Sequence, residues 1–249
     1  MSEKTITAGP LSGRVALVTG GSRGVGAAAV RRLAADGARV AFSYLNAADR
    51  AREVAESVPG SVAFRADVGE DAEMVRLVED TVRHFGRLDI LVHNAALFHG
   101  GPLTDPGRDE ALLARQFRTN LHGVVAGTRA AAAHLGEGGR IILISTAGSD
   151  RSNGLLIGDY AATKAALEAY GRAWTHEFGP RGITVNSIRP GAVDTDMLDR
   201  AGAAAAVPSI PLRRIGTPEE IADAIAYLAG PSAGYITGAV LRIDGGLYA

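Results

Sequence analysis

A tyrosine and a lysine one helical turn apart are the residues whose spacing points most directly to chemistry. Tyr160 and Lys164 open a segment whose large apolar residues recur at helical spacing, so both side chains share one face of the expected helix. A phenol with a pKa of about 10 exchanges protons poorly near neutral pH, and a neighbouring ammonium group favours its charged form. The pair can therefore serve as a general acid and base. Taken alone, the same spacing is more typical of a solvated helix face.

Two hydroxyl side chains precede this pair, at the end of an apolar run. Residues 140–145 are expected to form a buried strand that leads through Ser145 into Thr146. Where a chain is extended, neighbouring side chains point to opposite faces. Only one of these two hydroxyls is therefore expected to reach a substrate.

A glycine-rich turn lies between an expected strand at 14–19 and an expected helix at 27–36. Gly20, Gly24 and Gly26 let the backbone turn sharply and approach a pyrophosphate closely. The helix N-terminus that follows offers free N–H groups and a positive dipole end. The turn indicates a dinucleotide site. The alternative is that these glycines serve only the conformation of the turn.

Short apolar runs alternate with longer helix-patterned segments, which is typical of a parallel sheet built from βαβ units. Strands are expected at 14–19, 39–44, 62–66, 88–93, 140–145, 184–188 and 240–243. The first and fifth runs are apolar without alternation, as in central strands covered on both faces. The sequence predicts an α/β fold, a single Rossmann-type doubly wound domain over 11–249 with about seven parallel strands and helices on both faces. A flexible N-terminal tail is expected at 1–10.

The composition excludes several classes of function. With 26 basic and 27 acidic side chains the net charge is −1, which leaves no electrostatic footprint for nucleic acid or an anionic membrane. Cysteine is absent and the six histidines lack the spacing of a helical zinc site, so no metal site is expected. No apolar run could span a bilayer, and the polar N-terminus is unlike a signal peptide. We expect a cytoplasmic protein whose partners are small molecules or copies of itself.

The order of these motifs resembles the classical short-chain dehydrogenase/reductase family from Leu11 to Gly246. The turn at 19–26 matches the family's T-G-x-x-x-G-x-G pattern, and 160–164 matches its Y-x-x-x-K pattern. Segments most similar to 3-oxoacyl-carrier-protein reductases and their secondary-metabolite relatives are 11–14, 213–220 and 244–246. The resemblance implies hydride transfer between a nicotinamide dinucleotide and a carbonyl or alcohol substrate, free or linked to a carrier protein or CoA. It also implies a homotetramer or homodimer.

The resemblance assigns catalytic roles to single residues. Tyr160 is the acid/base, and Lys164 binds the cofactor ribose and tunes Tyr160. Thr146 hydrogen-bonds the carbonyl oxygen, with Ser145 as the second choice for this hydroxyl. Asn120 holds a water that links Lys164 to solvent.

The same resemblance, with the residue types of the turn, gives a set of cofactor contacts. The expected residues are Gly20, Ser22, Arg23, Gly24, Val25, Gly26, Ser43, Asn46, Asp67, Val68, Asn94, Ala95, Tyr160, Lys164, Pro190, Gly191, Val193 and Thr195. For Asp67 the alternative is a cap on a helix that starts near Glu70. His93 and Ala96 depart from the family's N-N-A-G, and His93 is interpreted as a packed or hydrogen-bonded structural histidine.

The residues around the adenine ribose favour NADP(H), with NAD(H) as the second choice. An acid at the end of the second strand would bind the ribose diol, and 42–46 contains none. Arg23 could bind a 2′-phosphate through its fork of donors, with Ser43 and Asn46 as neutral partners. We expect an NADP(H)-dependent ketoreductase or alcohol dehydrogenase with a substrate lid at about 197–212. The alternative is a dinucleotide-binding sensor or scaffold with weak or no turnover.

Overall fold

The computed structural model describes residues 9–151, 156–198 and 200–249, so most of the expected N-terminal tail, residues 1–8, lies outside it. One seven-stranded parallel sheet has the order β3-β2-β1-β4-β5-β6-β7. Its strands are β1 (Val15–Val18), β2 (Arg39–Tyr44), β3 (Val62–Arg65), β4 (Ile90–His93), β5 (Arg140–Ile144), β6 (Thr184–Pro190) and β7 (Val240–Ile243). The seven predicted strands are confirmed, each to within two residues at either end.

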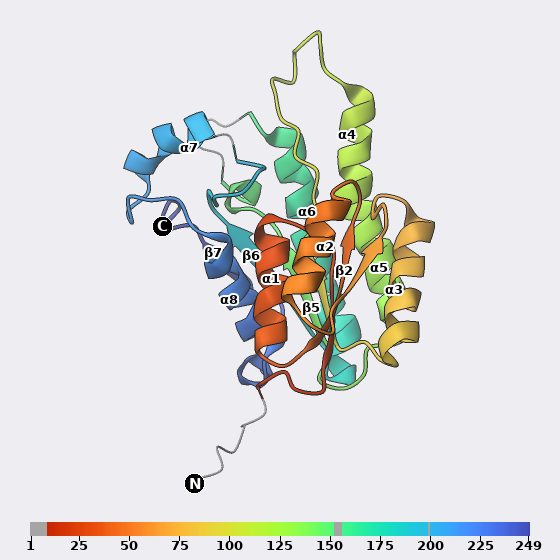
Figure 1. Ribbon diagram of the computed structural model, residues 1–249. Helices are drawn as coiled ribbons and strands as arrows, with labels where there is room; N and C mark the ends of the chain where they lie inside the picture. The colour runs from red at the N-terminus through yellow and green to blue at the C-terminus, as the bar shows by residue number, and fades with distance from the viewer. Residues whose placement is uncertain (1–8, 152–155, 199) are drawn as a thin grey trace.

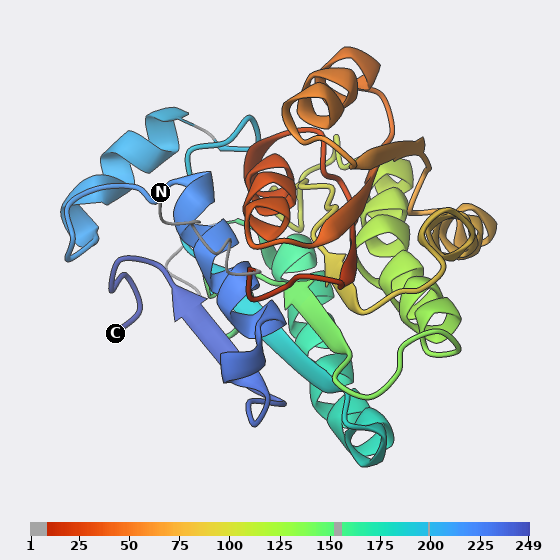
Figure 2. The ribbon, with the colours of Figure 1, turned by 60° about the horizontal axis from the view of Figure 1, so that its bottom comes forward.

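Helices cover both faces of this sheet (Figures 1 and 2). One face carries α1 (Gly24–Ala35), α2 (Ala48–Ser57) and α8 (Pro218–Ala229). The other carries α3 (Asp71–Phe85), α5 (Gly123–Ala131) and α6 (Gly158–Phe178). A further helix, α4 (Glu110–Phe117), leads into α5, and α7 (Arg200–Ala206) lies between β6 and α8 along the chain. The predicted doubly wound architecture is therefore confirmed.

Each strand feeds two hydrophobic cores, because successive side chains point to opposite faces. Val18 and Phe42 are fully buried in the core under α1 and α8. Leu17, Leu91 and Leu143 are fully buried in the core under α3, α5 and α6. This double burial explains why the central strands appear in the sequence as continuous apolar runs.

The strand order reverses at β1, which pairs with β2 on one side and with β4 on the other. In open α/β sheets, ligands bind in the crevice outside the carboxyl ends of the strands at such a switch point. The glycine-rich turn follows β1 and Asn94 follows β4, so both lie at this crevice.

Candidate active site

The glycine-rich turn is shaped by backbone positions that suit glycine. Gly20 and Gly24 have φ values of +68° and +52°, in the left-handed region. A Cβ on Gly26 would lie 2.1 Å from the carbonyl oxygen of Gly20. Helix α1 begins at Gly24 and not at the predicted 27, so its free N–H groups belong to the glycine motif itself. The turn therefore presents a close, donor-rich backbone surface suited to an anionic group.

Side chains from β2 and from the end of β4 hold this turn in place. The N–H of Gly20 donates to Ser43 Oγ at 3.0 Å. The Asn94 amide donates to the carbonyl oxygens of Thr19 and Gly20, at 2.9 and 3.1 Å. The hydroxyl of Thr19 accepts from the backbone N–H groups of Asn94 and Ala95. Ser43 and Asn94 thus build the cradle, and the buried Ser43 hydroxyl is directed to the turn.

A pocket of about 320 Å³ opens beside the turn, with Ser22, Arg23 and Arg50 in its wall. Arg23 Nη1 lies 3.5 Å from Asp196 Oδ2, and Arg50 pairs with the same carboxylate. Asn46 is exposed in the segment just before α2. Sequence reasoning missed Arg50. Its only signal was a basic residue in the first turn of the helix that follows the second strand.

Asp67 and Val68 connect the end of β3 to the neighbouring helices. Asp67 Oδ1 accepts from the N–H of Gly69 at 3.0 Å, and Oδ2 accepts from Arg115 at 2.7 Å. The N-cap position of α3 is Glu70, whose side chain makes no capping hydrogen bond, so the alternative of Asp67 as a helix cap is wrong. A Cβ on Gly123 would lie only 1.7 Å from the carbonyl oxygen of Val68, so the backbone at Val68 approaches the start of α5 closely.

Tyr160 and Lys164 lie in the first two turns of α6, and both are buried. Lys164 Nζ lies 5.7 Å from the centroid of the Tyr160 ring. The Phe98 and Tyr160 rings form a T-shaped pair at a centroid distance of 5.0 Å. Burial raises the pKa of Tyr160 to about 12 and lowers that of Lys164 to about 8. In the chain by itself, the Tyr160 pKa is therefore raised by desolvation, and the lowering that the sequence predicts from Lys164 is not seen.

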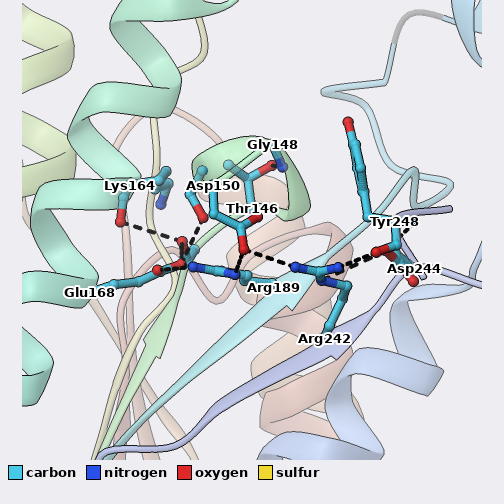
Figure 3. Close-up of polar contacts among 11 residues, drawn as sticks. Thr146, Gly148, Asp150, Lys164, Glu168, Arg189, Arg242, Asp244 and Tyr248 are labelled. Carbon is cyan, nitrogen blue, oxygen red and sulfur yellow. Dashed lines mark hydrogen bonds and ion pairs between the residues drawn. The ribbon is translucent and has the colours of Figure 1, made fainter. Parts of the chain in front are cut away.

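The two candidate hydroxyls at the end of β5 point in different directions. Ser145 is buried, and its Oγ donates to Glu168 Oε1 on α6 at 2.5 Å. Thr146 is half-buried and has extended backbone angles, with φ −152° and ψ 148°. Its Oγ1 accepts one long hydrogen bond, 3.4 Å, from the N–H of Gly148 (Figure 3). Of the two hydroxyls, that of Ser145 is committed to Glu168.

Asn120 is fully buried in a π-helical turn, Arg118–His122, which joins α4 to α5. Its side chain accepts from the N–H of Leu97 at 2.8 Å and donates to the Leu97 carbonyl oxygen at 2.9 Å. It also donates to Thr163 Oγ1 at 3.2 Å, and Thr163 donates to the carbonyl oxygen of Tyr160. A π-turn within an α-helix frequently marks a functional site. The sequence around Asn120 did not predict this π-turn.

The segment that follows β6 lies against the glycine turn. Pro190 ends β6, and the N–H of Gly191 donates to the Ile243 carbonyl oxygen at 2.9 Å. Val193 pairs with Gly216 in an isolated parallel bridge. The methyl group of Thr195 would stand 3.1 Å from a Cβ on Gly24, so Thr195 faces the turn across a narrow gap.

His93 is buried at the end of β4, with Nε2 3.0 Å from Thr128 Oγ1. Burial, with a smaller contribution from Lys164, lowers its pKa to about 3, so the ring is neutral near pH 7. This agrees with its interpretation as a hydrogen-bonded structural histidine.

Across the described residues, no group of three His, Asp or Glu side chains could hold a metal ion. Within the same ranges, no helix is both long and apolar enough to cross a membrane.

The doubly wound sheet has a glycine cradle at its switch point and a Tyr-Lys pair toward the carboxyl ends of the same strands. This combination is that of a dinucleotide-dependent oxidoreductase. The family model described as enoyl-(acyl carrier protein) reductase matches residues 20–248. The chain belongs to the short-chain dehydrogenase/reductase family of oxidoreductases.

Three similar proteins illustrate the range of this family. A cyclic-di-GMP-binding biofilm dispersal mediator protein of Escherichia coli is 39% identical, over 95% of this chain and 98% of its own. Versicolorin reductase 1 of Aspergillus parasiticus is 34% identical, over 96% and 97%. A short chain dehydrogenase from Burkholderia cenocepacia, solved in complex with NADP, is 39% identical with a TM-score of 0.93, over 96% of this chain and 100% of its own.

Proposed function

We propose that this protein is an NADPH-dependent carbonyl reductase in which Tyr160 is the acid/base. One observation supports the proposal: α6, which carries Tyr160 and Lys164, is hydrogen-bonded both to the strand that leads into Thr146 and to Asn120. These contacts lie toward the carboxyl ends of the strands, where the glycine turn also lies. The bound cofactor supplies the hydride for such a reaction. The chain supplies the binding, the orientation and the proton.

The residues present fit a phosphorylated dinucleotide. A Cβ would clash at Gly26, and Gly20 and Gly24 have the positive φ values that favour glycine. A diphosphate could therefore meet the backbone N–H groups of this cradle with no side chain between them. Arg23 and Arg50 line the adjoining pocket and suit a 2′-phosphate. The Burkholderia cenocepacia structure contains NADP, which supports the same preference here. Lys164 and Thr195 would hold the ribose and the nicotinamide end.

In the proposed reaction, Tyr160 donates its phenolic proton to the carbonyl oxygen of the substrate while Thr146 donates a hydrogen bond to the same oxygen. Charged Lys164 favours the phenolate that Tyr160 leaves behind. Asn120 would hold the water through which Lys164 and Tyr160 regain a proton. The substrate is a small carbonyl compound, free or linked to a carrier protein or CoA, and 197–212 would close over it as a lid. We place this activity in a cytoplasmic homodimer or homotetramer.

A second candidate is a sensor that binds nucleotide without turnover. It is favoured by the Escherichia coli relative, whose name records cyclic-di-GMP binding. In this chain, Arg23 and Arg50 stand at one pocket and could each meet a phosphate. Calorimetric titration of the purified protein with cyclic-di-GMP and with NADPH tests this alternative.

The direct test of the reductase is the consumption of NADPH, and separately of NADH, with β-ketoesters, cyclic ketones, quinones and aryl ketones. We expect at least one carbonyl to be reduced, faster with NADPH. If the protein binds cyclic-di-GMP and oxidises neither dinucleotide with any carbonyl, the sensor replaces the reductase.

A further inference from the structure

Glu168 is a buried carboxylate on α6 that the proposed proton transfer does not use. It lies one helical turn beyond Lys164 and is only 2% exposed. A buried charge is costly unless it is paired and fully hydrogen-bonded. The hydrogen-bond and ion-pair partners of Glu168 therefore indicate its role.

The carboxylate accepts hydrogen bonds from three side chains. Ser145 and Ser149 donate to Oε1 at 2.5 and 2.8 Å. Arg189 forms a bidentate pair, with Nε 2.7 Å from Oε1 and Nη2 2.5 Å from Oε2. Burial by itself raises the pKa of the Glu168 carboxyl, but the bonds from Arg189, Ser145 and Ser149 hold that pKa below its ordinary range. Glu168 is therefore charged at neutral pH.

The two serines stand on either side of Thr146. Ser145 directly precedes it, and Ser149 ends the short 3₁₀ turn Ala147–Ser149 that Thr146 caps. Because Thr146 is extended, its side chain points away from that of Ser145. The hydrogen bond from Ser145 to Glu168 therefore lies on the face opposite to the Thr146 side chain.

Glu168 is itself held by Arg189, which reaches it from β6 on the same face of the sheet as α6. Arg189, on β6, also pairs with Asp150, and Asp150 accepts from Arg242 on β7 at 2.9 Å (Figure 3). Arg242 donates in turn to the carbonyl oxygen of Tyr248 at 2.5 Å. This chain of charges holds Arg189, and through Arg189 it holds the Glu168 carboxylate.

We propose that Glu168 is a positioning residue. By accepting hydrogen bonds from Ser145 and Ser149, it fixes the strand end so that the Thr146 hydroxyl is oriented toward the substrate carbonyl. The inference rests on the proposed function, since the orientation of the Thr146 hydroxyl matters for carbonyl reduction. It concerns a residue that does not touch the reacting atoms.

The test compares Glu168→Gln with Glu177→Gln, a matched control because Glu177 is an exposed acid on the same helix. A misplaced donor costs about 10²-fold in rate, so we expect kcat to fall by about this factor in Glu168→Gln and to be unchanged in Glu177→Gln. The KM for NADPH should stay as in the wild type. Because Glu168 acts through Thr146, adding Glu168→Gln to Thr146→Ala should slow the enzyme little further.

A second readout needs no turnover. In protein labelled with ¹³C at the threonine methyl groups, the resonance missing from Thr146→Ala identifies Thr146. We expect it to shift or broaden in folded Glu168→Gln and to stay in place in Glu177→Gln. An unmoved resonance, or additive losses of kcat in the double variant, would overturn the inference. A wild type that reduces no carbonyl would defeat the proposed function alone, because the resonance still reports on positioning.

Discussion

The ammonium group of Lys164 donates a hydrogen bond to the backbone carbonyl oxygen of Ile144, 2.7 Å away at the end of β5. This contact joins the helix that carries Tyr160 to the strand that leads into Thr146. Burial lowers the pKa of Lys164 to about 8, although Glu168 acts in the opposite direction. The charge on this lysine therefore depends on pH within a range open to experiment.

We expect carbonyl reduction to slow as the pH rises through about 8, because Lys164 then loses the charge that favours the Tyr160 phenolate. His93 does not titrate there, since its pKa is about 3. The measurement is kcat/KM across this range, with Lys164→Arg as the control because arginine stays charged. An equally steep fall in an active Lys164→Arg variant would assign the titration to another group.

The same lysine should affect stability. Because its pKa is about 8 in the folded protein and 10.5 ordinarily, the unfolded chain binds more protons between these values. The contribution of Lys164 to the free energy of unfolding therefore rises with pH in that window. Urea unfolding of wild type and Lys164→Met at several pH values measures it, and a difference between them that does not change with pH contradicts the assignment.

The two hydroxyls at the end of β5 should differ in their effect on rate. Thr146→Ala removes the proposed donor to the carbonyl oxygen, so we expect a loss of about 2.7–4 kcal/mol of transition-state stabilisation, seen in kcat. Thr146→Ser should keep most of the rate. Ser145→Ala should cost less than Thr146→Ala, because the Ser145 hydroxyl is committed to Glu168. The reverse order of the two alanine variants would make Ser145 the donor.

The pocket lined by Arg23 and Arg50 should determine the preference for NADPH over NADH. Arg23→Ala and Arg50→Ala are each expected to weaken NADPH binding by about 1.5–3 kcal/mol, the range for hydrogen bonds to charged groups. NADH binding should change little, since it lacks the 2′-phosphate. Arg52→Ala is the control, because Arg52 is exposed on α2 and pairs with Asp49. Fluorescence titration gives both dissociation constants, and equal weakening for the two cofactors would refute the assignment.

The cradle should not tolerate a methyl group at Gly26. Its Cβ would meet the Gly20 carbonyl oxygen at 2.1 Å, whereas a Cβ on Gly136 meets nothing within 4 Å. We expect Gly26→Ala to lose NADPH binding and about 1–3 kcal/mol of unfolding free energy, the usual cost of overpacking. Gly136→Ala should keep both. Retained NADPH binding in Gly26→Ala would show that the cofactor lies elsewhere.

The sheet could be predicted from the sequence because buried parallel strands leave local signals. The apolar runs around Leu17 and Leu143 identify buried strands without information on the strands beside them. The glycines of the turn likewise indicate its backbone conformation by themselves. Tyr160 and Lys164 share a helix, so their spacing alone brought them together. These parts of the site depend on residues that are close in the chain.

The remaining features depend on contacts between distant residues. Glu168 has the sequence context of an ordinary helix acid, and only folding brings Arg189 to it. Arg50 and Asp196 meet across a gap of 146 residues. The raised pKa of Tyr160 follows from burial, which the motif does not encode. For the same reason, Asp67 could not be recognised as the partner of Arg115 in place of a helix cap.

In the proposed NADPH-dependent carbonyl reduction, Tyr160 delivers the proton. The most direct test measures NADPH binding and carbonyl-dependent NADPH oxidation in wild type and in Tyr160→Phe. We predict that both bind NADPH alike and that the variant is slower by about 10²–10⁴-fold, the usual contribution of a general acid. A variant that reduces the carbonyl as fast as the wild type would contradict the claim.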